Sequence, residues 1–386
     1  MKTIKDLVAI VNLSGKRVLL RADFNVPITD GKITDDFRII STLPTLDELM
    51  KQGLKIGIVA HIESNNEGEE STLRPVWVEL QNKLGADRVM WAENLEEMEG
   101  KMAILKEGEI VLMENIRQYE GEKKNDPELA QRLAGLADYF VNDAFSVCHR
   151  KHASIVGVPE ILPSFAGLQL EKEVTNLSQA FNPSRPFGFI LGGAKFETKL
   201  PLVKKYLDKA DWVAIGGALA NDVIKAGGGE VGESKVSKTV VDLSGVIGSE
   251  KLLPIIDVVV ENERGQVKTK KIDAVLPTDK IKDLGAETVR FWGEKIAAAE
   301  FVLWNGPIGW FEYSDFSAGT TELAKLLVAR RAAGAKVLIG GGDTVSAISE
   351  LGLLNEYSFI STGGGATLDF LANETLPGIE VIGKRN

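Results

Sequence analysis

The chain has 386 residues, of which 44% are hydrophobic and 26% charged, and its formal net charge is −10. This length favours two domains, and the acidic balance argues against nucleic acid and anionic membranes as partners, because both attract Lys and Arg. One cysteine, Cys148, excludes an internal disulfide, and the sequence contains neither a signal peptide nor an apolar run long enough for a membrane helix. We therefore expect a cytoplasmic protein in which Cys148 is a small buried hydrophobic side chain.

Short apolar runs alternate with amphipathic segments through the first half. The apolar runs predict strands at 17–21, 55–60, 109–113 and 138–141. The spacing of the apolar residues from Leu43 to Met50 predicts a helix over 41–53. This alternation is typical of an α/β fold, with a parallel sheet covered by helices on both faces.

The second half repeats the alternation after a break expected between 165 and 186. A predicted helix over 168–181 is followed by Pro183 and Pro186, which do not continue a helix. Strands are then predicted at 187–191, 212–215, 301–304 and 336–339. The apolar run at 257–261 begins a more irregular stretch, in which 262–265 resembles a hairpin turn and 268–271 is a charged edge.

Four glycine-rich turns follow apolar runs in this half, at 191–195, 215–218, 339–344 and 361–366. A strand that ends in glycines and turns into a helix presents free backbone N–H groups and a positive helix end, which together attract an anion. In open α/β sheets ligands lie outside the carboxyl ends of the strands. Because one turn carries Lys195 and another Asp343, the pattern predicts a polyphosphate ligand with a metal, although Asp343 can also cap its helix.

Polar and cationic side chains follow the strands of the first half. They are Asp23, Asn25, Arg38, His61, Arg117 and Arg150. We call Arg38, His61, Arg117 and Arg150 the cationic rim. Arginine binds carboxylate and phosphate groups through forked hydrogen bonds, so the rim suits a small anionic substrate. The alternative is a set of separate surface ion pairs.

Several motifs resemble those of phosphoglycerate kinases, in the family's order and nearly from end to end. They are RADFNVP at 21–27, ENIR at 114–117, NDAF at 142–145, LGGAKFETK at 191–199, WNGPIGWFE at 304–312, GGGDTV at 340–345 and STGGGA at 361–366. The resemblance implies two doubly wound, Rossmann-like α/β domains joined by a hinge helix. It implies a 3-phosphoglycerate-binding domain at 1–168, a hinge at 169–185 and a nucleotide-binding domain at 186–369, with 370–386 packing back on the first domain.

The resemblance also implies a reaction. An acyl phosphate is transferred reversibly from 1,3-bisphosphoglycerate to Mg-ADP, giving 3-phosphoglycerate and Mg-ATP, in a monomer whose two domains close during the reaction. The glycerate would be held by Asp23, Asn25, Arg38, His61, Arg117 and Arg150. The nucleotide would be held by Gly193, Lys195, Lys199, Gly217, Asn305, Glu312, Gly341, Gly342, Asp343 and Thr344. Asp343 would hold Mg²⁺, the catalytic residues would be Arg38, Lys199 and Gly342, and Trp304 and Trp310 are expected to pack rather than stack on a base.

The segment after His61 departs from the family. Where the family has Ser-His-Leu-Gly-Arg-Pro, residues 60–65 read Ala-His-Ile-Glu-Ser-Asn, and four glutamates lie at 63, 67, 69 and 70. One expected cation is therefore missing, and the added negative charge opposes an anionic substrate unless the loop points away from it. Two alternatives stay open: a related acyl-phosphate kinase that acts on a different small acid, and a non-catalytic nucleotide-binding protein.

Overall fold

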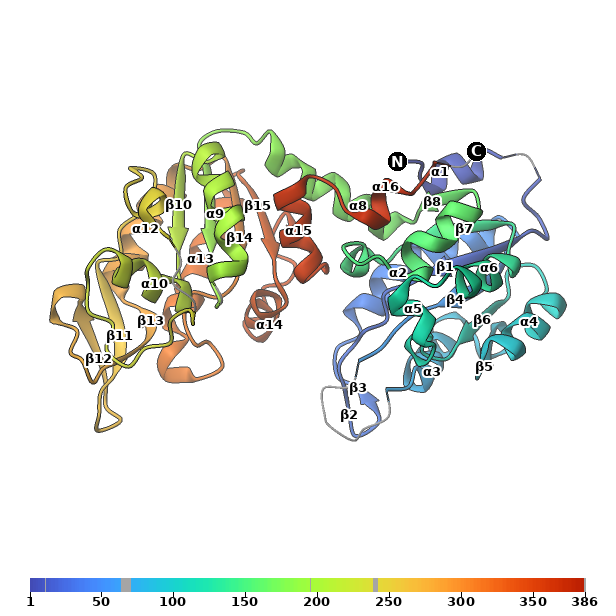
Figure 1. Ribbon diagram of the computed structural model, residues 1–386, viewed down its shortest axis with the longest axis horizontal. Coiled ribbons are helices and arrows are strands. Elements are labelled where there is room, and N and C mark those ends of the chain that lie inside the picture. The colour runs from blue at the N-terminus through green and yellow to red at the C-terminus, as the bar shows by residue number, and fades with distance from the viewer. Residues whose placement is uncertain (11, 64–70, 195, 239–241, 385–386) are drawn as a thin grey trace. The chain divides into compact units, whose positions relative to one another are not determined.

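The computed structural model describes residues 1–10, 12–63, 71–194, 196–238 and 242–384 (Figure 1). Contacts divide the chain into two compact units, unit 1 with Met1–Thr175 and Thr375–Asn386, and unit 2 with Asn176–Glu374. The division falls within helix α8 (Leu168–Leu177), and the hinge role of 169–185 stays a prediction. No helix in the described ranges is long and apolar enough to cross a bilayer.

Unit 1 is built on a six-stranded sheet in which every neighbouring pair is parallel. The strand order is β5-β6-β4-β1-β7-β8. The strands are β1 Arg17–Arg21, β4 Lys55–Val59, β5 Val89–Ala92, β6 Ile110–Met113, β7 Tyr139–Asn142 and β8 Ser164–Ala166. The strands that follow β1 lie on both of its sides, β4, β6 and β5 on one and β7 and β8 on the other, so the fold is doubly wound and its switch point lies beside β1.

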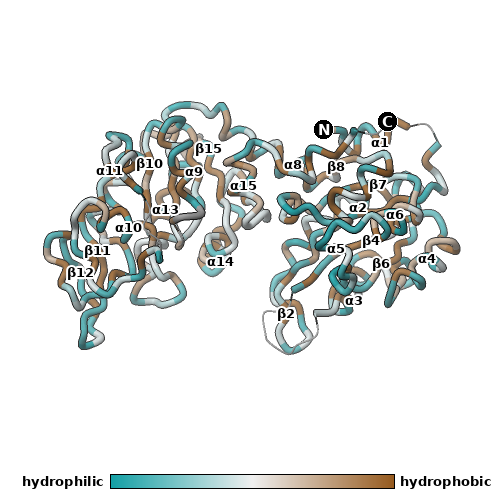
Figure 2. Tube along the Cα trace, in the orientation of Figure 1, coloured by the Kyte–Doolittle hydropathy of each residue, from teal (hydrophilic) through white to brown (hydrophobic). Residues whose placement is uncertain are grey.

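The helices of unit 1 connect these strands, and Figure 2 shows the strands as largely hydrophobic segments. They are α1 Ile4–Val8, α2 Phe37–Lys51, α3 Arg74–Leu84, α4 Leu95–Ile104, α5 Glu120–Lys124, α6 Pro127–Gly135, α7 Val158–Ile161, α8 and α16 Pro377–Glu380. A small hairpin, β2 Ile28–Thr29 and β3 Lys32–Ile33, precedes α2. The predicted helix over 41–53 begins four residues too late and ends two residues too late, since α2 runs from Phe37 to Lys51 and its apolar face already includes the buried Ile39.

The C-terminal segment packs on unit 1. Gly378 N donates to the carbonyl of Cys148 at 2.8 Å, and Gly383 N donates to Ser164 Oγ at 3.2 Å. Cys148 is fully buried, as the sequence predicted, and burial raises the pKa of its thiol to about 12. Its thiol is therefore a packed, un-ionised group.

Unit 2 contains a five-stranded parallel sheet in the order β10-β9-β14-β15-β16. Its strands are β9 Phe187–Leu191, β10 Trp212–Ile215, β14 Phe301–Asn305, β15 Lys336–Gly340 and β16 Phe359–Ile360. A second, antiparallel sheet has the order β12-β11-β13, with β11 Asp257–Glu261, β12 Val267–Lys271 and β13 Lys280–Leu284. The predicted strands match observed ones to within one residue at each end. Strands β2, β3, β5, β8, β13 and β16 were not predicted, and in β13 charged residues interrupt the apolar pattern.

The helices of unit 2 are α9 Phe196–Lys209, α10 Ala218–Ala226, α11 Ser244–Ile247, α12 Ala286–Ala298, α13 Ala318–Ala332, α14 Gly342–Glu350 and α15 Gly365–Asn373. Short 3₁₀ or π turns in the two units are η1 Ala86–Arg88, η2 Ile116–Gln118, η3 Phe145–Val147, η4 Ala153–Gly157, η5 Ser178–Phe181, η6 Ile272–Ala274 and η7 Ser314–Phe316.

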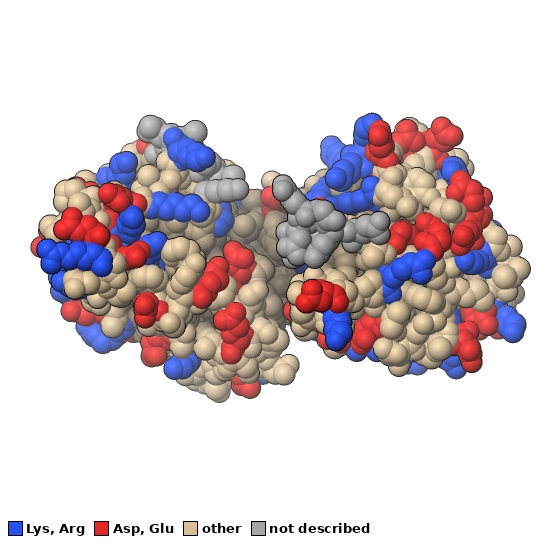
Figure 3. All heavy atoms as spheres, turned by 90° about the horizontal axis from the view of Figure 1, so that it is seen from below, with Lys and Arg blue, Asp and Glu red and all other residues tan. Residues whose placement is uncertain are grey.

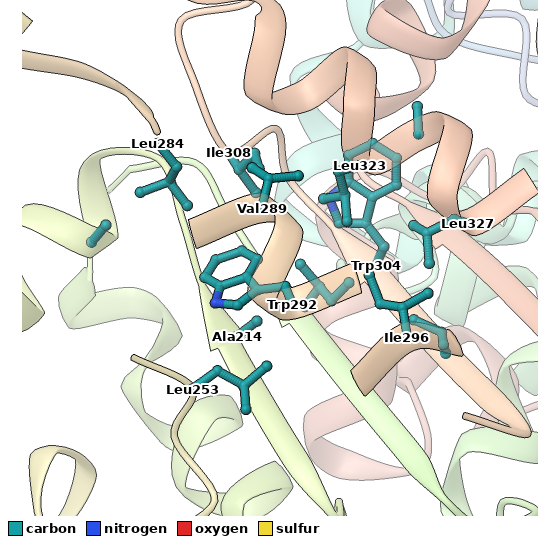
Figure 4. Close-up of a cluster of buried hydrophobic side chains, with 14 of the residues drawn as sticks. Ala214, Leu253, Leu284, Val289, Trp292, Ile296, Trp304, Ile308, Leu323 and Leu327 are labelled. Carbon is teal, nitrogen blue, oxygen red and sulfur yellow. The ribbon is translucent and has the colours of Figure 1, made fainter. Parts of the chain in front are cut away.

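Two tryptophans anchor the core of unit 2 (Figure 4). Trp292 on α12 and Trp304 on β14 are both fully buried. Trp304 Nε1 donates to the carbonyl of Gly306 at 2.7 Å, and Trp292 Nε1 donates to that of Pro254 at 3.2 Å. Each indole thus buries a large apolar surface with its N–H satisfied. Trp304 packs as the sequence predicted, and it holds the end of β14 in place.

Candidate active site

Acidic and basic side chains are interspersed over each unit in the view of Figure 3. The net negative charge therefore leaves room for local cationic sites. In unit 1 the carboxyl ends of β1, β4 and β6 lead to Asp23, His61 and Arg117. Because the strands are parallel, these side chains lie on one edge of the sheet, beside the switch point where ligands of such folds bind.

Arg38 lies on the first turn of α2 and reaches back to the loop after β1. Its Nη1 donates to Asp23 Oδ1 at 3.0 Å and to the carbonyl of Asn25 at 3.1 Å. Asn25 N also donates to Asp23 Oδ1, at 3.3 Å. The carboxylate of Asp23 therefore orients both the loop and the guanidinium, and 28% of the Arg38 side chain stays exposed. The geometry brings these three predicted residues together.

His61 is buried against Arg21, a residue to which the sequence assigned no role. Arg21 Nη2 lies 3.1 Å from His61 Nδ1. Because a guanidinium only donates, we assign Nδ1 as the acceptor and place the ring proton on Nε2. Burial lowers the pKa of His61 well below its usual value, and the positive charges of Arg21, Arg117, Arg150 and Arg38 lower it further. His61 is thus a neutral hydrogen-bond donor, so it does not add a charge to the cationic rim.

A chain of buried polar groups holds Arg21 in place. Its Nε donates to Ser154 Oγ at 2.9 Å, and Ser154 Oγ donates to Glu122 Oε1 at 2.6 Å. Burial raises the pKa of Glu122, but hydrogen bonds from His152 and Ser154 and the charge of Arg21 outweigh it, so the pKa is lowered. Glu122 is therefore the buried counter-charge of Arg21, and the chain fixes the orientation of His61.

Arg117 and Arg150 share an acidic neighbour from the segment that departs from the family. Arg117 forms an ion pair with Glu63, whose Oε1 also lies 3.9 Å from Arg150 Nη1. Only 7% of the Arg117 side chain is exposed, and its Nε and Nη2 find no hydrogen-bond partner within the described ranges. Burial and the charges of Arg150 and Arg21 lower the pKa of Arg117 to about 10. Such buried donors suit an anionic ligand. Residues 64–70 lie outside the described residues.

In unit 2 a pocket of about 540 Å³ lies among the strand ends and β13. Four of the predicted nucleotide residues line it: Gly193, Gly217, Glu312 and Asp343. Lys195, the fifth residue of the first glycine turn, lies outside the described residues. The pocket therefore joins turns that follow three different strands of the sheet, β9, β10 and β15.

The first two glycine turns differ from the sequence prediction of free N–H groups. Gly192 N and Gly193 N donate to the carbonyls of Asn305 and Pro307, at 2.8 and 3.1 Å, and Gly217 N donates to that of Ile308 at 2.9 Å. Gly217 has a φ of +61°, and a Cβ there would lie 2.6 Å from Gly193 N. These N–H groups are engaged because the glycines allow close backbone packing of the turns against the loop after β14.

The third glycine turn leads into α14, which begins at Gly342. A helix leaves its first N–H groups without partners inside the helix, so residues 342–344 offer donors at a positive helix end. Gly341 has a φ of +92°, and a Cβ there would lie 3.1 Å from Asn305 Oδ1. Thr344 Oγ1 is buried and accepts from Gly306 N at 2.7 Å. Its contact with a nucleotide stays a prediction, whereas its support of the loop is observed.

Lys199 lies on α9 and reaches back over the first turn. Its Nζ donates to the carbonyl of Gly192 at 3.0 Å. Burial lowers the pKa of Lys199, and the charge of Asp343 opposes this. A partly buried cation beside a carboxylate and a helix N-terminus is a suitable place for a phosphate group. Asn305 is also buried, and its Nδ2 lacks a partner among the described residues.

Sequence reasoning missed several pocket residues. They include Asn221 on α10, Lys235 in the segment after α10, and Lys282 and Asp283 on β13. Trp310 is 40% exposed and lines the pocket. Its ring packs edge-on against Tyr313, with 4.3 Å between the ring centroids, and Lys282 Nζ lies 4.0 Å from its centroid. That it packs rather than stacks on a base stays a prediction.

Asp283 links β13 to two other elements. Its Oδ1 accepts from its neighbour Leu284 N and its Oδ2 from Gly319 N, both at 2.8 Å. A Cβ at Gly309 would lie 2.0 Å from Asp283 Oδ1, so only glycine lets the loop approach this closely. Burial raises the pKa of Asp283 to about 7. The carboxyl therefore positions the loop that carries Trp310 and the start of α13.

The residues present fit Mg²⁺ only together with a phosphate ligand. The described residues contain no group of three His, Cys, Asp or Glu side chains that could hold a metal. Asp343 is one of several carboxylates that line the pocket, with Glu233, Asp283 and Glu312. Mg²⁺ is usually held by one or two carboxylates together with substrate phosphates, so one carboxylate is enough for a nucleotide-bound ion.

Comparisons with known proteins cover nearly the whole chain. The phosphoglycerate kinase family model matches residues 6–374. The phosphoglycerate kinase of Thermosipho africanus (strain TCF52B) is 42% identical over 99% of this chain and 98% of its own length. That of Dictyoglomus turgidum (strain DSM 6724 / Z-1310) is 41% identical, with 99% and 98% covered.

Solved structures agree with the sequence matches. The phosphoglycerate kinase from Coxiella burnetii superposes with a TM-score of 0.83 at 36% identity, covering 96% of this chain and 97% of that one. The enzyme from Pyrococcus horikoshii OT3 gives a TM-score of 0.84 at 30% identity, with 99% and 98% covered. Because the matches run through both parallel sheets and both groups of strand-end residues, the chain belongs to the phosphoglycerate kinase family.

Proposed function

We propose that this chain is an active phosphoglycerate kinase that transfers a phosphoryl group reversibly between 1,3-bisphosphoglycerate and Mg-ADP, giving 3-phosphoglycerate and Mg-ATP. The observation that carries the proposal is the pairing of two half-sites of matching chemistry. Unit 1 gathers cations and buried unpaired donors at its strand ends. Unit 2 gathers glycine turns, a lysine and a carboxylate around a pocket.

In unit 1 the cationic rim would hold the glycerate. Arg38, Arg117 and Arg150 supply fixed positive charges for the phosphate and carboxylate groups. His61 would donate from Nε2 to an oxygen of the substrate, because Arg21 occupies Nδ1. Asp23 and Asn25 orient Arg38, and they accept from substrate hydroxyl groups in this proposal.

In unit 2 the pocket would hold the nucleotide. Glu312 suits the ribose hydroxyls as an acceptor, and Gly193 and Gly217 let the backbone approach the ligand closely. Lys195, Lys199 and the N-terminal turn of α14 at Gly342 would neutralise the phosphates. That turn would be held in place by Asn305, Gly341 and Thr344, through the contacts described above.

Asp343 would hold Mg²⁺ with the nucleotide phosphates, and the ion would neutralise phosphate charge when bound. The reaction itself needs no general base. A β-phosphate oxygen of ADP, ionised at neutral pH, attacks the acyl phosphorus. The bond between that phosphorus and the acyl oxygen breaks, and the carboxylate of 3-phosphoglycerate leaves. The chain's task is therefore to position the groups and to stabilise the charge on the transferred phosphoryl group, for which Arg38, Lys199 and Gly342 are suited.

A coupled assay with Mg-ATP and 3-phosphoglycerate tests the proposal. Lys199→Ala and Arg38→Ala should each lower kcat by about 10²–10³, the usual cost of removing one preorganised donor. Lys204→Ala, an exposed lysine on the same helix α9, serves as the matched control and should leave kcat unchanged. Tight nucleotide binding by the unaltered protein without turnover would refute the proposal.

The two alternatives are less well supported. A different small acid or a non-catalytic role would leave the end-to-end match and the complete set of strand-end residues without an explanation. We also propose a monomeric state and a cytoplasmic location, the latter supported by the single, buried cysteine.

A further inference from the structure

Glu63 contacts three of the residues that we assign to the glycerate. Its backbone N–H donates to Asn25 Oδ1 at 2.9 Å. Its carboxylate forms an ion pair with Arg117 and reaches to 3.9 Å from Arg150 Nη1. Asn25, Arg117 and Arg150 lie on the loops that follow β1, β6 and β7, while Glu63 follows β4. One acidic residue therefore lies across the cationic rim.

The carboxylate of Glu63 matches the chemistry of the substrate groups that the rim would bind. A carboxylate and a phosphate both accept forked hydrogen bonds from a guanidinium. Burial and the charge of Arg150 lower the pKa of Arg117, so an anion held beside Arg117 favours its charged form.

The different exposures of the Glu63 and Arg117 side chains favour replacement of the Glu63 carboxylate by another anion on Arg117 and Arg150. Half of the Glu63 side chain is exposed, whereas only 7% of the Arg117 side chain is. Glu63 can therefore turn into water at little cost, but Arg117 cannot, and it needs an anion at all times. A bound substrate can supply that anion in place of Glu63.

We propose that Glu63 is an internal competitor for anionic substrates. Its carboxylate must leave Arg117 and Arg150 before a phosphate or carboxylate group of the substrate binds there, and this exchange weakens substrate affinity. The inference rests on the proposed function in so far as the rim binds 3-phosphoglycerate. The sequence placed negative charge in this segment, and the structure identifies Glu63 as the residue that pairs with Arg117 and lies near Arg150.

Steady-state kinetics of Glu63→Gln test the proposal. Removing the charge should lower KM for 3-phosphoglycerate by roughly threefold to tenfold, a range typical of partly screened charge pairs. KM for ATP should stay unchanged. Glu96→Gln is the matched control, since Glu96 is an exposed glutamate of unit 1 that pairs with Arg132 on α6. It should change neither constant. An unchanged or raised KM for 3-phosphoglycerate in Glu63→Gln would overturn the proposal.

Thermal unfolding with sulfate as the anion gives a second readout. Glu63→Gln should melt below the unaltered protein without sulfate, and sulfate should raise its melting temperature more and at lower concentration. Glu63→Asp, which keeps the charge on a shorter side chain, should fall between the two. Equal responses to sulfate in all three proteins would contradict the competition. If the unaltered protein shows no turnover, the proposed function fails, and the sulfate titration still decides the role of Glu63.

Discussion

Asp283 should make the stability of unit 2 fall as pH rises. Burial raises its pKa from 3.8 to about 7, so the native state binds a proton that the unfolded chain releases. Its stabilising contribution is complete below about pH 4 and is lost as pH rises through 7. Because a change of 1 in pKa corresponds to about 1.36 kcal/mol, the full loss is at most about 4 kcal/mol. Asp283→Asn should remove this dependence, since an amide resembles the protonated carboxyl.

The measurement is the free energy of unfolding in urea at several pH values between 4 and 8. The two units can unfold separately, so the fluorescence must report unit 2. Replacing Trp77 and Trp91 with Phe in both proteins leaves only the four tryptophans of unit 2. The stability difference between the Asp283 protein and Asp283→Asn should then decline by up to about 4 kcal/mol from pH 4 to pH 8.

Asp273→Asn is the control, because it removes the same charge at an exposed position of unit 2. Its stability difference from the unaltered protein should stay nearly constant over the same range. The reasoning from burial is refuted if the stability difference between the Asp283 protein and Asp283→Asn is equally independent of pH. That result would mean that solvent reaches the carboxyl.

Three further predictions concern groups whose contacts are described above. Arg21→Lys should raise KM for 3-phosphoglycerate by roughly threefold to tenfold, because lysine cannot donate hydrogen bonds in three fixed directions. NMR should show a raised pKa for His61 in this variant, and an unchanged His61 spectrum would contradict the prediction. Thr344→Val should cost about 1–3 kcal/mol in urea unfolding by leaving Gly306 N–H buried without an acceptor, and an unchanged midpoint would show that water replaces the hydroxyl. Cys148 should react with a thiol reagent only in denaturant, and rapid labelling of the native protein would be inconsistent with its burial and raised pKa.

Much of the fold could be predicted because its signals are local. Runs such as 187–191 are buried on both faces and therefore apolar throughout, and they predicted the strands to within one residue. Glycines at 341 and 217 marked positions with positive φ. Strand β13 was not predicted, because its residues face a pocket on one side and therefore include Lys282 and Asp283.

The candidate site could be predicted only in part. Arg117 was recognisable because the motif at 114–117 carries it, and Arg38 because it follows the first strand, and strand ends of a parallel sheet meet at one edge. The partners of Arg21 could not be found this way, because Ser154 lies 133 residues further along the chain. The protonation of His61 follows from that distant contact, and so does its change from an expected cation to a neutral donor.

By itself, the sequence determined the alternation of strands and helices, the glycine turns and the types of residue at the strand ends. These depend on local backbone preference and on which side chains avoid water. The tertiary structure decided which groups are paired. It placed Glu63 on Arg117 and Arg150, and it engaged the N–H groups of Gly193 and Gly217. Charge pairing and burial depend on distance in space, which residue types and their order do not specify.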